Sequence, residues 1–579
     1  MIDLINNEIA NFIDSIESVD EDSLNKIRNR YTSSITEDLK NGHYTSNICM
    51  VLASNLKLNP KELSTTLVEK LSNLKIFEKV ESAGPGFINI TLKREDFLST
   101  IKNINSVGEM YGRSFIGEGE KVQIEFVSAN PTGPLHVGHG RGAAYGDAIA
   151  RILTATGSEV EKEYYINDAG RQIDILTVSV IMKMAKIEGS FFPSNAYKGQ
   201  YIEDIGSYIE ENEKLKLNID ESIFKGLPTD PEKEIDSLIE TIKQKYPSEW
   251  NLIKSCSLKN ILEDINQDLQ NFNVDFDVWF KESSLGDLSD YKSQLTKSIN
   301  KLQEGGKTYE KDGAIWLNTE VSGDDKHRVL IRDNGKATYF ATDVAYHKNK
   351  VDRGFDKLIN VWGADHHGYI KRIEASIEAL GSNKDKLDVR LVQFANLFKD
   401  GKKVKMSTRS GEFFTLKNLI EDIGSDAARF YYLSKQADQH LDFDLDLAKS
   451  DSKENIFYYI QYAHARIVSL EEKVLYKFSD INRNIKNINN GNYKECDNLI
   501  HEISKFPDIV NKSANTLQPH VIIYFLKDLS QLFHSFYNDN HVLSESEENI
   551  QSILECLIAV KQVISNGLNL LGITPMQKM

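Results

Sequence analysis

Cysteine is scarce in this 579-residue chain, and basic residues are outnumbered by acidic ones. The four cysteines, Cys49, Cys256, Cys496 and Cys556, lie far apart and form no Cys-x-x-Cys pair, which argues against a zinc or redox motif and favours a reducing compartment. Lysine and arginine total 69 against 86 aspartate and glutamate residues, a net charge of -17. Such a chain does not coat nucleic acid through bulk electrostatics, so an RNA partner would have to be bound on a restricted face.

Long hydrophobic runs are also missing. No apolar stretch approaches the roughly 20 residues needed to cross a bilayer, and the N-terminal segment is acidic where a signal peptide would be basic. We therefore expect a cytoplasmic protein with no membrane partner. The chain exceeds the roughly 250 to 300 residues at which a single core stops growing, so several domains are predicted.

The segment 122–157 has the pattern of a strand followed by a helix. Residues 122–127 predict a buried strand, and residues 140–156 carry Ala and Ile at helical spacing after a link rich in Pro and Gly. A crossing of this kind directs a helix N-terminus, with free N–H groups and partial positive charge, at a ligand above the sheet. We predict that this ligand is a phosphate.

Two histidines, His136 and His139, lie in this link at the start of the predicted helix. Because residues three apart share a helical face, both imidazoles can meet one phosphate, and Gly138 leaves room for a flat ring near the backbone. Imidazole N–H groups can stabilise charge that builds on a phosphate in a transition state. The alternative is a turn with two surface histidines, but the flanking strand and helix favour the phosphate site.

The chain divides into three predicted units. Residues 1–112 combine helical periodicity with two short strands and predict a small appended α+β domain. Residues 113–450 alternate strands and helices and predict an α/β Rossmann-like catalytic domain, a doubly wound parallel sheet, with a helical insertion at about 179–270. Residues 451–579 predict an all-α helical bundle whose core is the apolar helix 550–571.

Short β-like runs are predicted throughout the first two units, and polar residues follow several of them. Ligands of open parallel sheets bind at the carboxyl ends of the strands, so these polar clusters are candidate site residues. The predicted strands are 77–80, 87–92, 161–166, 278–280, 314–317, 329–331, 358–362 and 389–394. The polar clusters are 167–171, 281–285, 339–343 and 363–368.

A lysine-rich loop, 399–410, follows the last predicted strand. It contains Lys402, Lys403, Lys405 and Arg409 beside hydroxyl residues. Lysine is a point charge that can follow a moving phosphate, and arginine is a fork that can hold one through two hydrogen bonds. Taken alone, a solvated basic loop is the usual explanation for such a run.

Together, HVGH at 136–139 and KMSTR at 405–409 resemble the paired HIGH and KMSKS motifs of class I aminoacyl-tRNA synthetases. Thr408 stands where that family has a lysine, and Arg409 supplies a charge one residue later. SANPTGPLHVGHGRG, WGADHHGY, DAARFYYL and YYIQYAHARI are similar to the bacterial-type arginyl-tRNA synthetases. The resemblance covers all three units and implies that the first contacts the outer corner of the tRNA and the last binds the anticodon.

The resemblance implies that L-arginine is ligated to tRNA-Arg in two steps. Arginyl-adenylate forms from arginine and ATP with release of pyrophosphate, and the arginyl group then passes to the 2′-hydroxyl of the terminal adenosine. ATP is thus a substrate, and Mg²⁺ is expected with it. No dedicated metal site is predicted, because Asp365, His366 and His367 lack a further well-spaced ligand. We expect a monomer whose partners are tRNA-Arg and L-arginine and that has no DNA partner.

The resemblance also implies roles for single residues. The catalytic residues are His136 and His139, which hold the α-phosphate, and Lys405 and Arg409, which draw away the β- and γ-phosphates. Asp343 is the first choice for the guanidinium, and Asn130 for the α-carboxylate or amino group. The implied ATP-binding residues are His136, Gly138, His139, Asp365, His366, Lys405, Met406 and Ser407. The implied arginine-binding residues are Glu125, Asn130, Tyr339, Asp343 and His366.

Two alternatives stay open. One is another HxGH nucleotidyl transferase, acting on a different amino acid or on a small molecule, although a simple ligase has no use for the C-terminal helical unit. The other is a catalytically silent protein that only binds RNA. The presence of His136, His139 and Lys405 argues against this alternative. Selectivity is expected from the arginine pocket, and the insertion is interpreted as helical decoration without an editing role.

Overall fold

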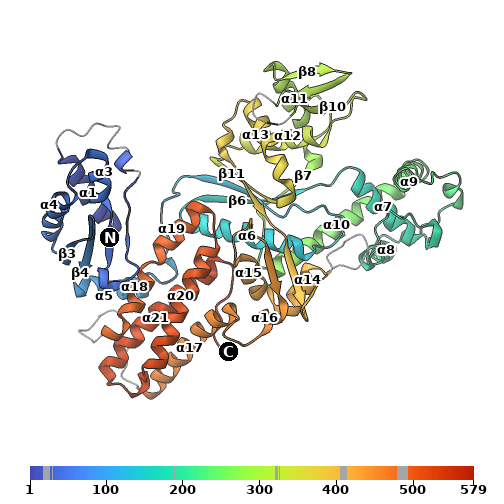
Figure 1. The fold of residues 1–579 in the computed structure, drawn as a ribbon. Coiled ribbons are helices and arrows are strands. Elements are labelled where there is room, and N and C mark those ends of the chain that lie inside the picture. The colour runs from blue at the N-terminus through green and yellow to red at the C-terminus, as the bar shows by residue number, and fades with distance from the viewer. Residues whose placement is uncertain are drawn as a thin grey trace.

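The computed structural model describes residues 1–16, 26–28, 30–187, 189–319, 324, 326–404, 414–478 and 493–579. Figure 1 shows the N-terminal unit (blue) and the C-terminal helices (red) on one side of the molecule and the helical insertion on the other, with the central sheet between them. The residues of the predicted site motif 405–409 lie outside the described residues.

A five-stranded parallel sheet forms the centre of the molecule. Its order is β12-β11-β5-β6-β7, so β5, which precedes the other four strands of this sheet in the chain, lies in the middle. All four pairings are parallel, which confirms the predicted doubly wound α/β fold. The order reverses between β5 and β11, and this switch point is where such sheets bind ligands. The strands are β5 (Lys121–Glu125), β6 (Glu159–Ile166), β7 (Val278–Lys281), β11 (Lys357–Gly363) and β12 (Leu387–Val392).

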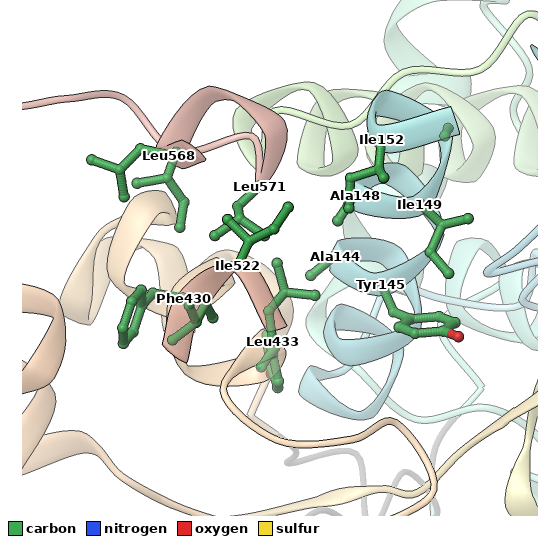
Figure 2. Packing of buried hydrophobic residues seen from close by; sticks show 14 of the residues in the cluster. Ala144, Tyr145, Ala148, Ile149, Ile152, Phe430, Leu433, Ile522, Leu568 and Leu571 are labelled. Carbon is green, nitrogen blue, oxygen red and sulfur yellow. The ribbon is translucent and has the colours of Figure 1, made fainter. Parts of the chain in front are cut away.

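The helix that follows β5 is α6 (Val137–Ala155), and it is buried along most of its length. Gly146 allows the close approach to the sheet, because a Cβ there would lie 2.3 Å from Cγ of Phe126. On its other side, Ala144, Ala148 and Ile152 face Ile522 and Leu571 of the C-terminal unit (Figure 2). The predicted apolar inner face of this helix is confirmed.

Two insertions interrupt the sheet. The first is helical, as predicted, and its helices begin at Arg171, earlier than the predicted residue 179. The second contains a small antiparallel sheet of order β10-β9-β8, which confirms the strands predicted at 314–317 and 329–331. The first insertion comprises α7 (Arg171–Met184), α8 (Gln200–Asn212), α9 (Pro231–Lys245) and α10 (Pro247–Asn271). The second comprises α11 (Gln294–Glu304), β8 (Thr308–Lys311), β9 (Ala314–Leu317) and β10 (Arg328–Ile331).

The rest of the central unit surrounds the switch point. Helix α12 (Tyr339–Asp352) leads into β11, and α13 (Ile370–Ala379) joins β11 to β12. Beyond β12 a second small sheet has the order β14-β13-β15. Its strands and the neighbouring helices are β13 (Ala395–Lys399), β14 (Lys402–Lys403), α14 (Leu416–Ile423), α15 (Ser425–Leu433), β15 (Leu441–Asp444) and α16 (Leu445–Lys449).

The N-terminal unit is an antiparallel sheet of order β1-β2-β4-β3 packed against helices. The predicted turn between its two longest strands is confirmed, and Gly84 and Gly86 adopt the positive φ values, 55° and 127°, that favour glycine. Its elements are α1 (Ile2–Asp14), β1 (Ser33–Ile35), β2 (Tyr44–Ser46), α3 (Ile48–Leu56), α4 (Pro60–Ser72), β3 (Phe77–Ala83), β4 (Phe87–Leu92) and α5 (Arg94–Val107).

The C-terminal unit is a helical bundle, as predicted. Helix α21 is long and apolar enough to cross a membrane, contrary to the expectation that no run approaches that length, but 67% of its most apolar window is buried. It packs against α17 and α5, so it is a core helix. The helices are α17 (Ile456–Lys477), α18 (Asp497–Ser504), α19 (Phe506–Thr516), α20 (His520–Asp539) and α21 (Glu547–Leu570).

A buried ion pair within the central unit is also bonded to the C-terminal unit. The Arg429 guanidinium donates to Oδ2 of Asp147 on α6 at 2.6 Å, and neither side chain is exposed. The same guanidinium donates to the carbonyl of Leu571, just beyond α21, at 2.9 Å. A Cβ at Gly572 would lie 2.2 Å from Nη2 of Arg429, so the chain can pass over this pair only as glycine.

Candidate active site

His136 and His139 form a compact pair at the start of α6. His136 is the N-cap, and its Nδ1 accepts the backbone N–H of Gly138 at 3.0 Å. Nδ1 of His139 in turn accepts the backbone N–H of His136 at 3.3 Å. The two rings stack with centroids 3.7 Å apart. Because both Nδ1 atoms are acceptors, the proton of each neutral ring is on Nε2, which remains a donor.

Burial keeps both rings uncharged at neutral pH. It lowers the pKa of His136, and burial together with the neighbouring His136 lowers the pKa of His139 to about 3. A neutral imidazole can donate from Nε2 without bringing a charge of its own. The pair is therefore arranged to donate two hydrogen bonds to an anion near the helix N-terminus, where partial positive charge already favours one.

Gly138 is required by the packing of this turn. A Cβ there would lie 2.6 Å from Cε1 of His136 and 3.1 Å from Cδ1 of Phe394. The Phe394 segment is held in place by the buried guanidinium of Arg141, whose Nη1 donates to the Gln393 carbonyl at 2.8 Å. Arg141 also donates to the carbonyls of Gln436 and Gln439, both at 2.7 Å. The prediction that Gly138 leaves room for a flat ring is confirmed.

The structure does not describe Lys405, Met406, Ser407 and Arg409, so their predicted roles are untested. It does fix the residues on both sides of 405–413. Upstream, the Val404 N–H donates to the Leu397 carbonyl at 2.8 Å. Downstream, Thr415 forms a β-bridge with His136, and the Leu416 N–H donates to the Leu135 carbonyl at 2.8 Å. The downstream anchor of the lysine loop is thus bonded to the histidine turn.

A second group of predicted residues lines one cavity of about 260 Å³ at the switch point. Glu125 at the end of β5, Asp343 on α12 and His366 after β11 share it with Tyr165, Trp362 and Tyr369. The Tyr369 hydroxyl donates to Oδ2 of Asp343. Two carboxylates and several aromatic faces in a small space suit a planar cation such as a guanidinium. We name this the carboxylate cavity.

A buried lysine supports the wall of the carboxylate cavity. Lys350, which has no exposed surface, donates to Oε2 of Glu125 at 2.5 Å and to Oδ1 of Asn360 at 2.8 Å. Nδ2 of Asn360 is 2.9 Å from Nε2 of His347, whose Nδ1 is 2.8 Å from the Asp343 carbonyl. Burial and Lys350 lower the pKa of His347 to about 3, so His347 is neutral, donates from Nδ1 and accepts at Nε2.

The negative charges of the two cavity carboxylates are balanced to different extents. Glu125 has the ammonium of Lys350, whereas the side-chain partner of Asp343 among the described residues is the uncharged Tyr369 hydroxyl. The pKa of Asp343 is raised to about 7, mainly by burial and also by Glu125 and Glu282, while the Tyr369 hydrogen bond and Lys350 act in the opposite direction. Burial also raises the pKa of Glu282. A cation that enters beside Asp343 would therefore meet a carboxylate whose charge is otherwise poorly balanced.

The backbone between the cavity and the histidine turn is strained. Val127 and Ser128 adopt φ values of 66° and 40°, and such a conformation costs a β-branched residue about 1–3 kcal/mol. It places Oγ of Ser128 where it donates to Oε1 of Glu125 at 3.0 Å and accepts the Tyr165 N–H at 3.1 Å. Strain of this kind is concentrated at functional sites.

The remaining predicted residues lie at the edges of the site. Asn130 is exposed and lines a second cavity of about 510 Å³ that also includes His136 and His139. Tyr339 is 61% exposed, one helical turn before Asp343. Asp365 and His366 are exposed, and Nε2 of His366 lies 3.7 Å from Oδ2 of Asp365. Among the described residues, no group of three or more His, Cys, Asp or Glu side chains is placed to hold a metal.

Sequence reasoning missed several residues that the cavity depends on. Lys350 and His347 belong to no quoted motif. Tyr369 ends the WGADHHGY segment but received no role, and Glu282 appeared only within a polar cluster. A charged residue at a buried helical position is a recognisable signal, and Lys350 lies one helical turn after the buried residues Tyr346 and His347. Its partner, Glu125, is 225 residues away, so the pairing itself has no local signature.

Comparisons with known proteins agree with this geometry. The family described as tRNA synthetases class I (R), catalytic domain, matches residues 100–470. The arginyl tRNA synthetase N terminal domain matches residues 3–92, and the DALR anticodon binding domain matches residues 460–579.

Whole-length relatives point to one amino acid. The arginine–tRNA ligase of Thioalkalivibrio sulfidiphilus is 44% identical over 94% of each chain, and that of Vesicomyosocius okutanii is 45% identical over 93% of each chain. In fold, the chain is similar to the arginyl-tRNA synthetase of Thermus thermophilus over the full length of both chains, with a TM-score of 0.73 at 19% identity. The chain belongs to the arginine–tRNA ligases, the arginyl members of the class I aminoacyl-tRNA synthetases.

Proposed function

We propose that this chain ligates L-arginine to tRNA-Arg at the expense of ATP, through an arginyl-adenylate. The observation that carries the proposal is the position of the carboxylate cavity beside two neutral histidines at the switch point of a parallel sheet. One part suits a guanidinium and the other a phosphate, and adenylation needs the carboxylate at the other end of the bound arginine to reach the α-phosphate of ATP.

In the first half of the site, arginine would place its guanidinium in the carboxylate cavity. Asp343 would accept its hydrogen bonds, supported by Glu125, since a charge-assisted pair of N–H···O bonds matches that planar cation. Asn130, at the exposed edge of the turn, would hold the α-carboxylate or the amino group. Tyr339 and His366 would border the pocket, Tyr339 from the turn of α12 that precedes Asp343.

In the second half, ATP would lie on the histidine turn. Nε2–H of His136 and of His139 would donate to the α-phosphate as the arginine carboxylate attacks it in line, and Gly138 would let the nucleotide approach the backbone. Asp365 and His366 would lie near the adenosine. Lys405, Met406, Ser407 and Arg409 would bind the leaving pyrophosphate, and the bonded anchor of their loop at Thr415 supports this assignment.

No protein nucleophile is needed in this mechanism. Arginine's carboxylate displaces pyrophosphate, and the terminal 2′-hydroxyl of the tRNA then displaces AMP. The protein contributes positioning and stabilisation of charge. Mg²⁺ would accompany ATP and neutralise its phosphates; we assign it no ligand in the described residues, which hold no cluster suited to a metal.

Selectivity would come from the carboxylate cavity itself. A neutral or shorter amino acid leaves Asp343 buried without a partner, and the resulting loss of affinity makes a separate proofreading step unnecessary.

The outer units would bind the tRNA. We propose domain limits of 1–112, 113–450 and 451–579, with the first on the outer corner of the RNA and the last on the anticodon. In the last unit Tyr458 stacks on Tyr462 at 5.8 Å, and the Arg466 guanidinium lies 3.7 Å from the Tyr537 ring centroid, an arrangement suited to unpaired bases. We further propose that the enzyme is a cytoplasmic monomer without a DNA or membrane partner.

Charging total tRNA with each amino acid in turn tests the proposal. Arginine alone is expected to give stable aminoacyl-tRNA, together with pyrophosphate exchange into ATP in the presence of arginine and tRNA. Charging with another amino acid would contradict the proposed specificity. Binding of tRNA without exchange would mean that the protein is catalytically silent.

A further inference from the structure

Tyr346 of α12 is the least exposed residue that lines the carboxylate cavity. It is 2% exposed, whereas the other Tyr and Trp residues of the lining are half-buried. It follows Asp343 by three residues, so the two side chains share one face of the helix. The ring of Tyr346 therefore closes the inner end of the cavity, beside the carboxylate that is proposed to bind the guanidinium.

The hydroxyl of Tyr346 is bonded to a second buried carboxylate, outside the cavity. It donates to Oε1 of Glu163 at 2.5 Å, and Glu163 has no exposed surface. Glu163 precedes Tyr165 on β6 by two residues, so both face the same side of the sheet, and only Tyr165 lines the cavity. The hydroxyl of Tyr346 thus reaches past the cavity toward the amino end of β6.

An arginine fixes Glu163 in turn. Nη1 of Arg353, the residue after α12, donates to Oε2 of Glu163 at 2.5 Å and to Oε1 of Glu161 at 3.1 Å. Glu163 is the register partner of Glu125 in the neighbouring strand, and Glu125 has the ammonium of Lys350 at 2.5 Å. Two adjacent carboxylates of the sheet are therefore each held by their own cation.

The ring of Tyr346 is also packed against several neighbours. Its centroid lies 4.5 Å from that of Tyr165 and 4.9 Å from that of Phe280, and the Lys350 ammonium lies 4.5 Å from it. Burial, together with the two neighbouring carboxylates, raises the pKa of Tyr346 well above its ordinary value, so the hydroxyl stays protonated and remains a donor. Packing and a hydrogen bond to a fixed partner hold such a side chain in one position.

The two ends of a bound amino acid are limited independently in the proposed site. The carboxylate must reach the α-phosphate at the histidine turn, and the guanidinium must meet Asp343 before the chain runs into the Tyr346 ring. Because both limits are set by groups held in place, only one length of side chain fits between them. One methylene too many or too few in such a pocket costs about 10–200-fold in specificity.

We propose that Tyr346 sets the length of the guanidino side chain that the cavity accepts, and that Glu163 and Arg353 are positioning residues that hold its ring. The inference rests on the proposed function, in which the guanidinium of the substrate enters this cavity. The amino acids that it excludes are those that differ from arginine only in chain length, such as homoarginine, which has one more methylene. Charge alone does not exclude them, because their guanidinium suits Asp343 equally well.

The test compares arginine with homoarginine in the enzyme supplied with ATP and tRNA. The KM for arginine is measured in tRNA charging, and homoarginine is added as a competitor to obtain its Ki. The ratio of Ki to KM does not depend on the concentration of folded enzyme, so a variant that is merely less stable keeps the ratio of the wild type. The wild-type ratio should be at least about 10.

Two single variants and their combination separate the roles. Tyr346→Phe removes the hydroxyl, and Glu163→Gln removes the charge that strengthens both hydrogen bonds of this carboxylate. Each should lower the ratio of Ki to KM at least about threefold. The double variant should lower it no further than the stronger single variant, because Glu163 acts through Tyr346.

Glu555→Gln is the matched control. It removes the charge from another buried carboxylate that accepts a tyrosine hydroxyl, that of Tyr493 at 2.6 Å, in the C-terminal unit, and it should keep the wild-type ratio. A wild-type ratio of about 1, an unchanged ratio in Tyr346→Phe and Glu163→Gln, or an equal fall in the control would overturn the proposal. Additive losses in the double variant would overturn the role of Glu163. Failure of the wild type to charge arginine would instead contradict the proposed function, so the two failures are distinguishable.

Discussion

The histidine turn and the carboxylate cavity lie at the same edge of one sheet, yet burial has opposite consequences for them. In the turn, burial keeps His136 and His139 neutral, and the backbone N–H bonds to Nδ1 leave Nε2 as the donor. In the cavity, burial also favours the neutral form of Asp343, although a guanidinium is held best by its charged form. The first region benefits from desolvation, and the second needs its ligand to overcome it.

The two regions differ in whether their buried groups need a partner of opposite charge. The histidine pair needs no counter-charge, whereas Glu125 in the cavity forms an ion pair with Lys350 at 2.5 Å. Asp343 forms no such ion pair in the part of the chain that the structure describes, and under the proposed function the guanidinium of the substrate would supply its counter-charge. The following predictions, from the largest expected effect to the smallest, test whether charge controls the cavity and neutrality controls the turn.

Asp343→Asn should have the largest effect. Replacing the carboxylate removes the charge that the guanidinium would compensate, and we expect the KM for arginine in tRNA charging to rise about 1,000-fold. Asp352→Asn, on the exposed end of the same helix, is the control and should leave the KM unchanged. An unaltered arginine dependence in Asp343→Asn would show that another carboxylate binds the guanidinium.

His139→Ala should act on the other region. Removing one Nε2–H donor from the α-phosphate should slow adenylate formation about 100-fold, measured by pyrophosphate exchange in the presence of tRNA. The Kd for tRNA should change little, because the ring is held within the turn. His440→Ala, an exposed histidine of the same unit, serves as control. Equal losses of exchange rate and tRNA affinity would contradict the role of His139.

Lys350→Met tests compensation directly. It leaves Glu125 buried without a counter-charge, which should lower the free energy of unfolding by about 3–5 kcal/mol in a urea titration and raise the KM for arginine about tenfold. Lys348→Met, which removes a surface pair with Asp352 on the same helix, should cost less than about 1 kcal/mol. Similar losses in both variants would mean that the buried pair contributes no more than the surface pair.

The smallest effect is expected from a change of pH. It should alter the KM for arginine, which depends on the cavity, and leave the contribution of the histidine turn unchanged. Asp343 has a pKa raised to about 7, so it is protonated as the pH falls below that value and loses the charge that binds a guanidinium. The KM for arginine should therefore rise as pH falls, by at most about tenfold per pH unit. The histidines remain neutral over this range, so kcat at saturating arginine should stay level. Asp343→Asn should abolish the pH dependence of KM.

The sequence was most informative where geometry is local. Spacing of three residues at a helix start predicted the His136–His139 pair, because an N-cap fixes both rings relative to the backbone. The parallel sheet was predictable for a similar reason, since each strand and its following helix form a local repeat. Roles assigned by resemblance to Lys405, Met406, Ser407 and Arg409 remain predictions, because the structure does not describe them.

The pairing of buried charged and polar groups from distant segments could not be predicted. The Lys350–Glu125 pair and the Tyr369–Asp343 bond depend on how β5, α12 and β11 are brought together, and no periodicity encodes that. The exposure of single side chains could not be predicted either. Tyr339 and Asp343 lie on one helical face, yet Asp343 lines the cavity while Tyr339 is 61% exposed. The second cavity was not predicted, because Tyr197 and Tyr201 in its wall belong to the insertion, which was interpreted only as helical decoration.

The Arg429–Asp147 pair has a consequence for the order in which the protein is built on the ribosome. The Leu571 carbonyl that completes the hydrogen bonding of Arg429 is 142 residues further along the chain, about 7–28 s of synthesis at about 5–20 residues per second. During that interval the guanidinium and Asp147 lack the segment that seals them from water. Helix α6 can therefore reach its final packing only after the C-terminal helices have been made.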